Sequence, residues 1–171
     1  MKIVLVGYMG SGKSTIGKLL AGNLDYEFID LDDYIESFEK MEIPKIFKLN
    51  GEIYFRKKEF EYLNEILHTK DNFVLSTGGG TPCYGENMNA ILEATPNVFY
   101  EKISIAGLIN RLISEKEHRP LISNIPNEEL PDFIGKHLFE RSYFYSQANH
   151  SLLCDENSKE EVVLKIEELL V

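Results

Sequence analysis

The sequence predicts an α/β domain of three layers, in which a five-stranded parallel sheet carries helices on both faces. The first observation is that short apolar runs alternate with longer segments whose apolar residues recur every three or four positions. The second is that helical segments separate these runs, and strands connected in this way pair in parallel under a cover of helices. The third is the length, because 171 residues can bury roughly 68–70% of their unfolded surface as one domain.

The expected strands are short runs rich in β-branched and aromatic side chains. In chain order they are Lys2–Val6, Glu27–Asp30, Asn72–Ser76, Asn97–Tyr100 and Ser151–Cys154. The expected helices repeat apolar residues at helical spacing. In chain order they are Lys13–Leu24, Asp32–Glu42, Glu52–His68, Met88–Ala94, Ser104–Lys116, a segment ending at Ala148, and Ser158–Leu170.

Local features support these assignments along the chain. The first strand is a continuous β-branched run, which is typical of a strand buried on both faces. The helix from Ser104 begins with a hydroxyl residue suited to an N-cap. Residues 117–131 contain three prolines and many polar side chains, so we expect a mobile loop there, with a composition suited to a lid.

Three stretches of unusual chemistry follow expected strands. They are the stretch from Gly7, the acidic stretch Asp30–Asp32 and the triple glycine Gly78–Gly80. Ligands of open parallel sheets bind beyond the carboxyl ends of the strands. We therefore expect the three stretches to share one rim of the sheet and to form the functional site.

The stretch Gly7–Ser14 matches the pattern G-x-x-x-x-G-K-[ST] and lies between a strand and a helix, as its mechanism requires. Its glycines let backbone N–H groups surround a phosphate at the positive end of the following helix. Lys13 supplies a charge to the phosphate oxygens, and the Ser14 hydroxyl ligates Mg²⁺. The sequence thus predicts a P-loop NTPase-type fold that binds a nucleoside triphosphate through Gly10, Ser11, Gly12, Lys13, Ser14 and Thr15.

Two features at the same rim have more than one interpretation. Asp30 and Asp32 lie two residues apart at a strand end, where carboxylates can hold the water molecules of a metal or accept a hydroxyl proton. Alternatively, Asp32 or Asp33 is the N-cap of the next helix. Residues 78–80 are either a simple turn or a binding site lined by backbone.

Four further residues place charged or aromatic side chains in the expected helices. Arg56 lies in a charged helix, where an isolated arginine is usually a solvated surface residue. Glu59 follows it at the i+3 position and either orients it or forms an ordinary surface pair. Tyr143 and Tyr145 are expected to be packing residues.

The composition argues against several classes of partner. A formal net charge of −10 disfavours nucleic acid, whose binding needs a basic surface. No apolar run reaches the ~18 residues of a membrane span, and the first run is too short for a signal peptide. We therefore expect a cytoplasmic protein. We also expect a monomer, although neither charge nor hydropathy specifies the oligomeric state. Cys83, Cys154 and the four histidines lack metal-ligand spacing, so no transition-metal site is expected.

Taken together, these stretches resemble the shikimate kinase family over nearly the whole chain. The resemblance is carried by "GYMGSGKST", "DLDD", "FRKKE", "TGGG", "RPL" at 119–121 and "ERSYFY" at 140–145. It implies a kinase that transfers the γ-phosphoryl group of ATP to the 3-hydroxyl of shikimate. The products would be shikimate 3-phosphate and ADP, in the biosynthesis of chorismate and the aromatic amino acids.

The resemblance also implies roles for individual positions. The shikimate contacts would be Asp32, Arg56, Gly78, Gly79, Gly80 and Arg141. Catalysis would involve Lys13, Asp32 and Arg119, with Asp32 orienting or deprotonating the acceptor hydroxyl. Asp30 would join Ser14 at Mg²⁺, Arg119 would reach the phosphates with the lid, and Arg111 would stack on adenine. Residues 32–62 would form the shikimate-binding part, and residues 155–158 depart from the family's proline-containing adenine loop.

Three alternative functions are also compatible with the phosphate loop. Another small-molecule kinase, such as a gluconate kinase, would not need Arg56, the triple glycine and Arg141 together. A nucleotide-dependent switch would transfer phosphate only to water, but N-K-x-D is absent and DxxG occurs only at 132–135. A silent binding module is disfavoured because no expected catalytic position is replaced.

Overall fold

The computed structural model describes residues 1–119 and 121–171, and within them the strands form one parallel sheet. The strands are β1 (Lys2–Val6), β2 (Glu27–Asp30), β3 (Phe73–Ser76), β4 (Val98–Lys102) and β5 (His150–Leu153). Their order in the sheet is β2-β3-β1-β4-β5, and each neighbouring pair runs in parallel. This confirms the predicted fold class.

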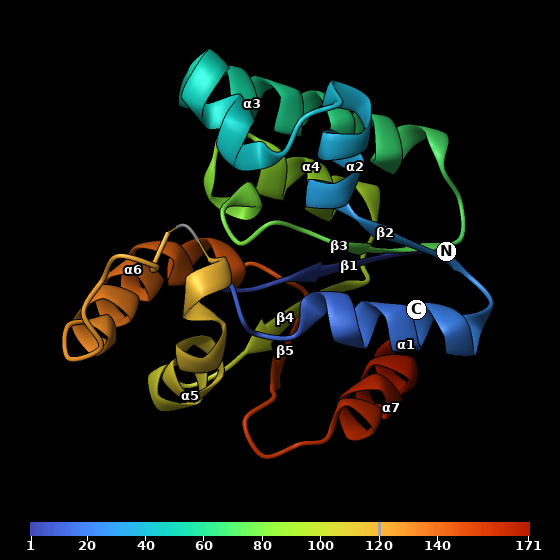
Figure 1. The fold of residues 1–171 in the computed structure, drawn as a ribbon. Coiled ribbons are helices and arrows are strands. Elements are labelled where there is room, and N and C mark those ends of the chain that lie inside the picture. The colour runs from blue at the N-terminus through green and yellow to red at the C-terminus, as the bar shows by residue number, and fades with distance from the viewer. Residues whose placement is uncertain (120) are drawn as a thin grey trace.

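The helices cover both faces of this sheet. They are α1 (Lys13–Leu24), α2 (Leu31–Glu39), α3 (Ile43–Thr69), α4 (Asn87–Ala94), α5 (Ile105–Glu115), α6 (Leu130–Tyr145) and α7 (Lys159–Leu169). Two short 3₁₀ segments cover Thr81–Cys83 and Lys116–His118. Figure 1 shows α3 and α4 on one side of the sheet and α1 and α7 on the other, which gives the three layers. No candidate for a membrane span occurs among the helices of the described residues.

The core lies on the central strands, and it fixes where the phosphate loop begins. Residues 3–6 of β1 and 73–75 of β3 have no exposed surface, as expected for strands covered on both faces. Gly17 of α1 brings that helix close to the sheet, because a side-chain carbon there would lie 2.6 Å from the ring of Phe28. The loop between β1 and α1 is therefore held from both ends by buried elements.

The boundaries of α2 differ from the prediction. We expected a helix over Asp32–Glu42, but α2 begins at Leu31 because Asp30 is its N-cap and accepts a hydrogen bond from the backbone N–H of Asp32 (3.1 Å). It ends at Glu39, where Lys40 adopts the left-handed conformation with φ of 53°. Neither Asp32 nor Asp33 is the cap.

The helix predicted over Glu52–His68 begins earlier, at Ile43. The backbone N–H of Ile43 donates to the carboxylate of Glu36 (2.8 Å), and a proline occupies the first turn. Gly51 interrupts the helix with φ of 82° and ψ of 170°, so α3 is two helical pieces that meet at a kink. The polar and glycine residues around this kink hid the first piece from a search for continuous periodicity.

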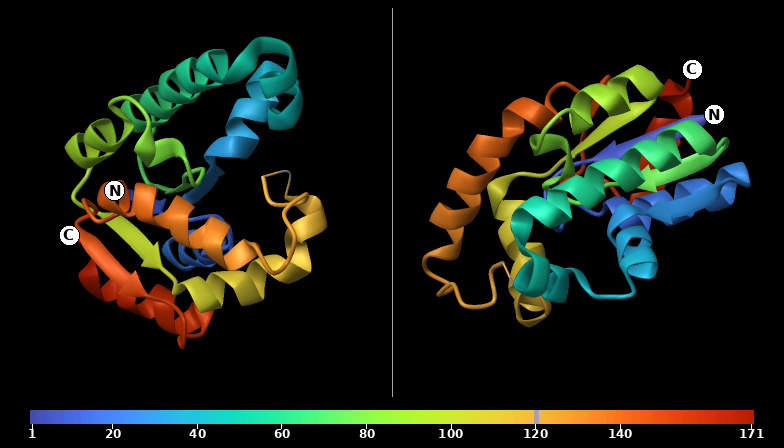
Figure 2. Two further views of the ribbon diagram at one scale, coloured as in Figure 1. Left: turned by 90° about the vertical axis from the view of Figure 1, so that its left-hand side faces the viewer. Right: turned by 90° about the horizontal axis from the view of Figure 1, so that it is seen from above.

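Among residues 117–119 and 121–131, which the structure describes within the predicted lid, no long element precedes α6. These residues comprise the end of the second 3₁₀ segment, turns over residues 121–129 and the first residues of α6; Pro120 lies outside the described residues. In both views of Figure 2 this segment lies on the same side of the molecule as the first turns of α3. The segment thus lies on the side of the molecule that carries part of residues 32–62, which we expect to bind the acceptor.

Candidate active site

The phosphate loop requires its glycines. Gly7, Gly10 and Gly12 have φ angles of 150°, 78° and 113°, which side chains rarely allow. A side-chain carbon at Gly7 would also lie 2.9 Å from the carbonyl oxygen of Glu101. Gly12 is the N-cap of α1, so the N–H groups of the first helical turn carry no side-chain cap. They remain suited to an anion at the positive end of the helix.

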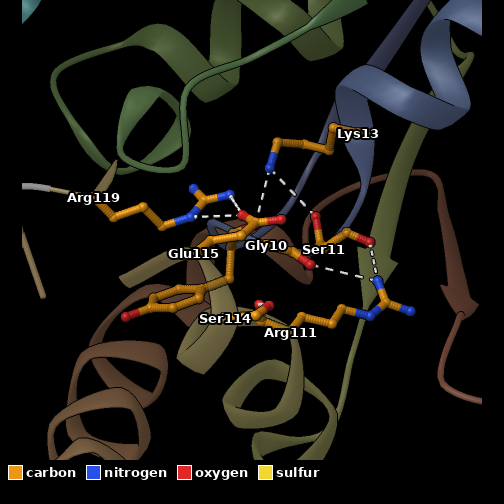
Figure 3. A network of polar contacts seen from close by, with 8 residues as sticks. Gly10, Ser11, Lys13, Arg111, Ser114, Glu115 and Arg119 are labelled. Carbon is orange, nitrogen blue, oxygen red and sulfur yellow. Dashed lines mark hydrogen bonds and ion pairs between the residues drawn. The ribbon is translucent and has the colours of Figure 1, made fainter. Parts of the chain in front are cut away.

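Lys13 lies buried against this loop, with 7% of its surface exposed. Its ammonium group donates to the carbonyl oxygens of Gly7 (2.9 Å) and Tyr8 (2.9 Å) and to the hydroxyl of Ser11 (3.3 Å). Figure 3 shows the side chain directed toward the loop. Burial lowers the pKa of Lys13, while the charges of nearby carboxylates oppose that shift. Three acceptors nevertheless suit the ammonium form, which has three hydrogens to donate.

A group of oxygen atoms lies beside Lys13 and suits magnesium. The Ser14 hydroxyl donates to Oδ2 of Asp30 (2.6 Å) and lies 3.2 Å from the hydroxyl of Ser76. Oδ1 of Asp30 is the cap of α2 at the same time. Mg²⁺ prefers oxygen ligands and is bound by few protein groups, with water and phosphate completing its shell. Ser14 and Asp30 therefore fit the predicted metal site.

Asp32 lies in the first turn of α2 and lines the same cavity as Lys13. Its pKa is raised to about 7, chiefly by burial and also by the charges of Asp30 and Glu59, against the opposing charge of Lys13. A side-chain carbon at Gly78 would lie 2.9 Å from Oδ1 of Asp32. A carboxyl with a pKa near neutral pH can serve as a general base.

The triple glycine brings three predicted residues together. A side-chain carbon at Gly78 would meet Asp32, one at Gly79 would lie 3.5 Å from Nη1 of Arg141, and one at Gly80 would lie 2.9 Å from Nη2 of Arg56. These neighbours come from α2, α6 and α3. The stretch is a turn of bare backbone that three charged side chains approach.

The guanidinium of Arg56 is held in place on two sides. Nη1 donates to the carboxylate of Glu59 (2.8 Å), and the group lies 3.7 Å from the ring centre of Tyr84. Glu59 is 1% exposed and also accepts from the Thr81 hydroxyl (2.7 Å). Glu59 is thus a buried orienting partner of Arg56 and not an ordinary surface pair. Nε of Arg56 has no hydrogen bond among the described residues.

Replacing Glu59 with alanine is expected to lower the free energy of unfolding by about 2 kcal/mol, because Arg56 and Thr81 both lose a partner. Urea unfolding followed by circular dichroism measures this change. The matched control is Glu61→Ala on the same helix, since Glu61 is exposed and its ion pairs within the described residues are with the surface lysines 57 and 58. Equal destabilisation by the two substitutions would contradict the buried role of Glu59.

Arg111 and Arg119 both bond to other residues of the chain in this structure. Figure 3 shows Arg111 beneath the loop, where Nη1 donates to the carbonyl oxygen of Ser11 (2.7 Å) and Nη2 to that of Cys154 (3.2 Å). Arg119 forms an ion pair with Glu115, which is one helical turn before it. Arg119 and Glu115 line the same cavity as Lys13, so the arginine lies near the place where phosphates are expected.

Two cavities lie on either side of the phosphate loop. One, of about 250 Å³, is lined by Lys13, Ser14, Asp30, Asp32, Arg119 and the glycines 78 and 79. The other, of about 380 Å³, is lined by Arg111, Cys154, Asn157 and Lys159, and it shares Gly10, Gly12 and Thr15 with the first. A molecule that extends along the loop can therefore reach both cavities. Arg56, Gly80 and Arg141 lie outside the linings of both.

Some side chains of the site carried little signal in the sequence. Tyr84 stacks on Arg56 from a loop distant in the chain, and no local spacing indicates that contact. Tyr145 is buried as predicted, and its hydroxyl also donates to the carbonyl oxygen of Gly79. Tyr143, predicted to pack, is instead 70% exposed. The partner of Arg119 also carried little signal, because Arg119 was expected in the lid, beyond the helix that contains Glu115.

Comparison with known sequences agrees with these features. A family model described as shikimate kinase matches residues 9–171. The chain is 43% identical over 169 residues to the shikimate kinase of Flavobacterium psychrophilum, and the match covers 99% of this chain and 98% of that protein.

Comparison with solved structures gives the same result. The crystal structure of the shikimate kinase from Bacteroides thetaiotaomicron superimposes with a TM-score of 0.92 at 36% identity, covering 99% of this chain and 97% of that one. The shikimate kinase from Acinetobacter baumannii, solved in complex with shikimate, superimposes with a TM-score of 0.88 at 31% identity. That match covers 98% of this chain and 91% of that one.

Proposed function

The chain belongs to the shikimate kinase family, and we propose from its geometry how it transfers the γ-phosphoryl group of ATP to the 3-hydroxyl of shikimate. The observation that supports this proposal most is the triple glycine, which Asp32, Arg56 and Arg141 approach from three different helices. Asp32 also lines the cavity that contains Lys13. An acceptor bound on this surface would face a nucleotide bound in the loop.

Shikimate presents a carboxylate and three ring hydroxyls. Arg56 and Arg141 would bind the carboxylate, because a guanidinium offers paired charge-assisted hydrogen bonds. Gly79 and Gly80 would let the ring approach the backbone closely, since no side-chain carbon intervenes. Asp32 would accept a hydrogen bond from the 3-hydroxyl and orient it toward the γ-phosphate.

The nucleotide would lie along the phosphate loop. Backbone N–H groups of residues 10–15 would surround the phosphates, and the second cavity beside Arg111 would receive adenine. Ser14 and Asp30 would hold Mg²⁺, which when bound neutralises charge on the phosphate oxygens. Lys13 would turn from the loop carbonyls to the phosphates, and Arg119 would leave Glu115 for them.

Asp32 would take the hydroxyl proton as the acceptor oxygen approaches phosphorus. Lys13 and Arg119 would offset the negative charge that is spread over the transferred group. Holding both reactants in line can lower the barrier by ~7–11 kcal/mol. Residues 117–131 would close over the full site and exclude water, the competing acceptor, while residues 32–62 carry the acceptor.

We further propose that the enzyme works as a monomer in the cytoplasm, with ATP and shikimate as its partners. A formal net charge of −10 favours a soluble monomer and disfavours nucleic acid.

A coupled assay of ADP release tests the proposed function. We expect rapid ADP release with shikimate, and only background release with gluconate or with no acceptor. Preferential use of gluconate would reassign the acceptor, and equal release without any acceptor would favour a nucleotide-dependent switch.

Replacing Arg56 or Arg141 with alanine is expected to weaken shikimate binding by about 1.5–3 kcal/mol, or roughly 10–150-fold. ATP affinity should change little, because neither arginine lines the cavities beside the loop. Calorimetric titration with each substrate separates the two effects. Lys57→Ala is the matched control, since Lys57 lies beside Arg56 but its side chain is 73% exposed. Equal weakening of shikimate binding and ATP binding would contradict the assignment of these arginines to the shikimate site.

A further inference from the structure

A buried acid lies beneath the phosphate loop, and the proposed transfer does not use it. Glu101 belongs to β4 and has no exposed surface. Neither of its carboxyl oxygens has a hydrogen-bond partner within residues 1–119 and 121–171. A buried polar group without partners is costly, and an ionised one is more so. Its presence at this place therefore calls for a physical explanation.

The carboxyl group of Glu101 faces the loop from the side of the protein interior. A side-chain carbon at Gly12 would lie 3.7 Å from Oε2 of Glu101 and 3.7 Å from Nη1 of Arg111. The backbone of Glu101 likewise limits the space at Gly7. The acid thus lies on one side of the loop while the expected phosphates lie on the other.

Two cations and one thiol face Glu101 from the surrounding elements. They are Lys13 from α1, Arg111 from α5 and Cys154, which directly follows β5. Burial raises the pKa of Glu101 to about 7 although both cations oppose the shift, and burial raises the pKa of Cys154 to about 12, so the thiol stays neutral.

Within this cluster Glu101 is the group that can change its charge. Lys13 donates to three acceptors, which stabilises the ammonium form, and Arg111 donates to backbone carbonyls as a permanent cation. Glu101 receives no hydrogen bond among the described residues, so its ionised form depends only on the two nearby cations.

We propose that Glu101 is a positioning residue that balances Lys13 and Arg111 before nucleotide binds, and that it takes up one proton from solvent when nucleotide phosphates enter the loop. Phosphates add several negative charges on the far side of Gly12 and draw Lys13 toward themselves. An ionised Glu101 would then repel them, and protonation removes that repulsion. The inference rests on the proposed binding of nucleotide by the phosphate loop.

The proposal predicts how nucleotide affinity depends on pH. At low pH Glu101 is already protonated, so binding needs no proton; at high pH the proton must be taken up, and affinity falls. For the full chain with Mg²⁺ and ADP, we expect the Kd to rise by up to about tenfold between about pH 6 and about pH 8. Glu101→Gln mimics the protonated acid, so it should lose this rise apart from the part that Asp32 contributes in both proteins, and its Kd should be up to about tenfold lower than wild type at about pH 8.

Calorimetric titration with Mg²⁺ and ADP measures both quantities. Repeating it at about pH 8 in two buffers of different ionisation enthalpy counts protons, and wild type should take up close to one proton more than Glu101→Gln. Glu93→Gln, which removes an exposed acid of α4, should behave as wild type. Glu101→Leu repeats the test should the buried amide prevent folding.

The outcomes separate this inference from the proposed function. Equal pH dependence of the Kd in wild type and in both Glu101 variants would overturn the inference. A pH dependence that is kept in the variants but moves to lower pH would also overturn it, because Lys13 would then be the titrating group. Should neither variant fold, the absence of proton uptake by wild type at about pH 8 would overturn it. If ADP does not bind wild type at all, the proposed function fails instead.

Discussion

Replacing Lys13 with alanine is expected to lower kcat by about 10³-fold, the effect of removing one donor that stabilises developing charge in a closed site. Lys13 is buried at the loop, and its ammonium lies where it can turn from carbonyl oxygens to phosphates. The ADP-release assay with saturating shikimate measures the loss. Circular dichroism of the variant should match wild type, because α1 is anchored by its apolar face.

Lys18→Ala is the control for this substitution. Lys18 lies in the same helix but is exposed, and its ammonium group lies 5.6 Å from the ring centre of Phe28. It should retain full activity. A Lys13 variant that keeps more than about a tenth of wild-type kcat would show that the phosphate loop does not perform the transfer.

Replacing Asp32 with asparagine is expected to lower kcat by about 10²–10⁴-fold and to change the KM for shikimate little. The amide can still bond the acceptor hydroxyl, but it cannot take the proton. Asp33→Asn is a closely matched control, since Asp33 is the next residue of α2 and is exposed. An unchanged kcat in the Asp32 variant would reduce that residue to an orienting group.

The pH profile gives a second measure of the same role. The pKa of Asp32 is raised to about 7, so the carboxyl is mostly protonated below that pH and cannot accept a proton. We expect kcat/KM for shikimate to rise with pH through about 7 in wild type and to lack that rise in Asp32→Asn. A wild-type profile that stays flat down to about pH 5 would contradict a general base at this position.

Much of the site could be predicted because it lies at strand ends. The pattern G-x-x-x-x-G-K-[ST] already specified the conformation of Gly7–Ser14, and parallel pairing of β1, β2 and β3 brought the following loops to one rim. The triple glycine needed the structure, because only the packing of α2, α3 and α6 shows what approaches each glycine. Local spacing carries no information about such contacts.

The misses have equally specific causes. The first piece of α3 was overlooked because Gly51 breaks the periodicity, and α2 was displaced because Asp30 is its cap. Glu101 escaped notice because the fourth strand was expected to end at Tyr100. The structure extends that strand to Lys102, and this extension places a charged residue inside the core.

The side chain of Asp30 contacts both the helix that begins at the phosphate loop and the helix that carries Asp32. One of its oxygens caps the helix that carries Asp32, and the other accepts the hydrogen bond of the Ser14 hydroxyl at the phosphate loop. The distance between the phosphate loop and Asp32 therefore depends on a single carboxylate group that bonds to both, and not on the packing of two separate domains. We expect any substitution of Asp30 to disturb both the phosphate loop and the start of α2, so the two cannot be altered separately at this position.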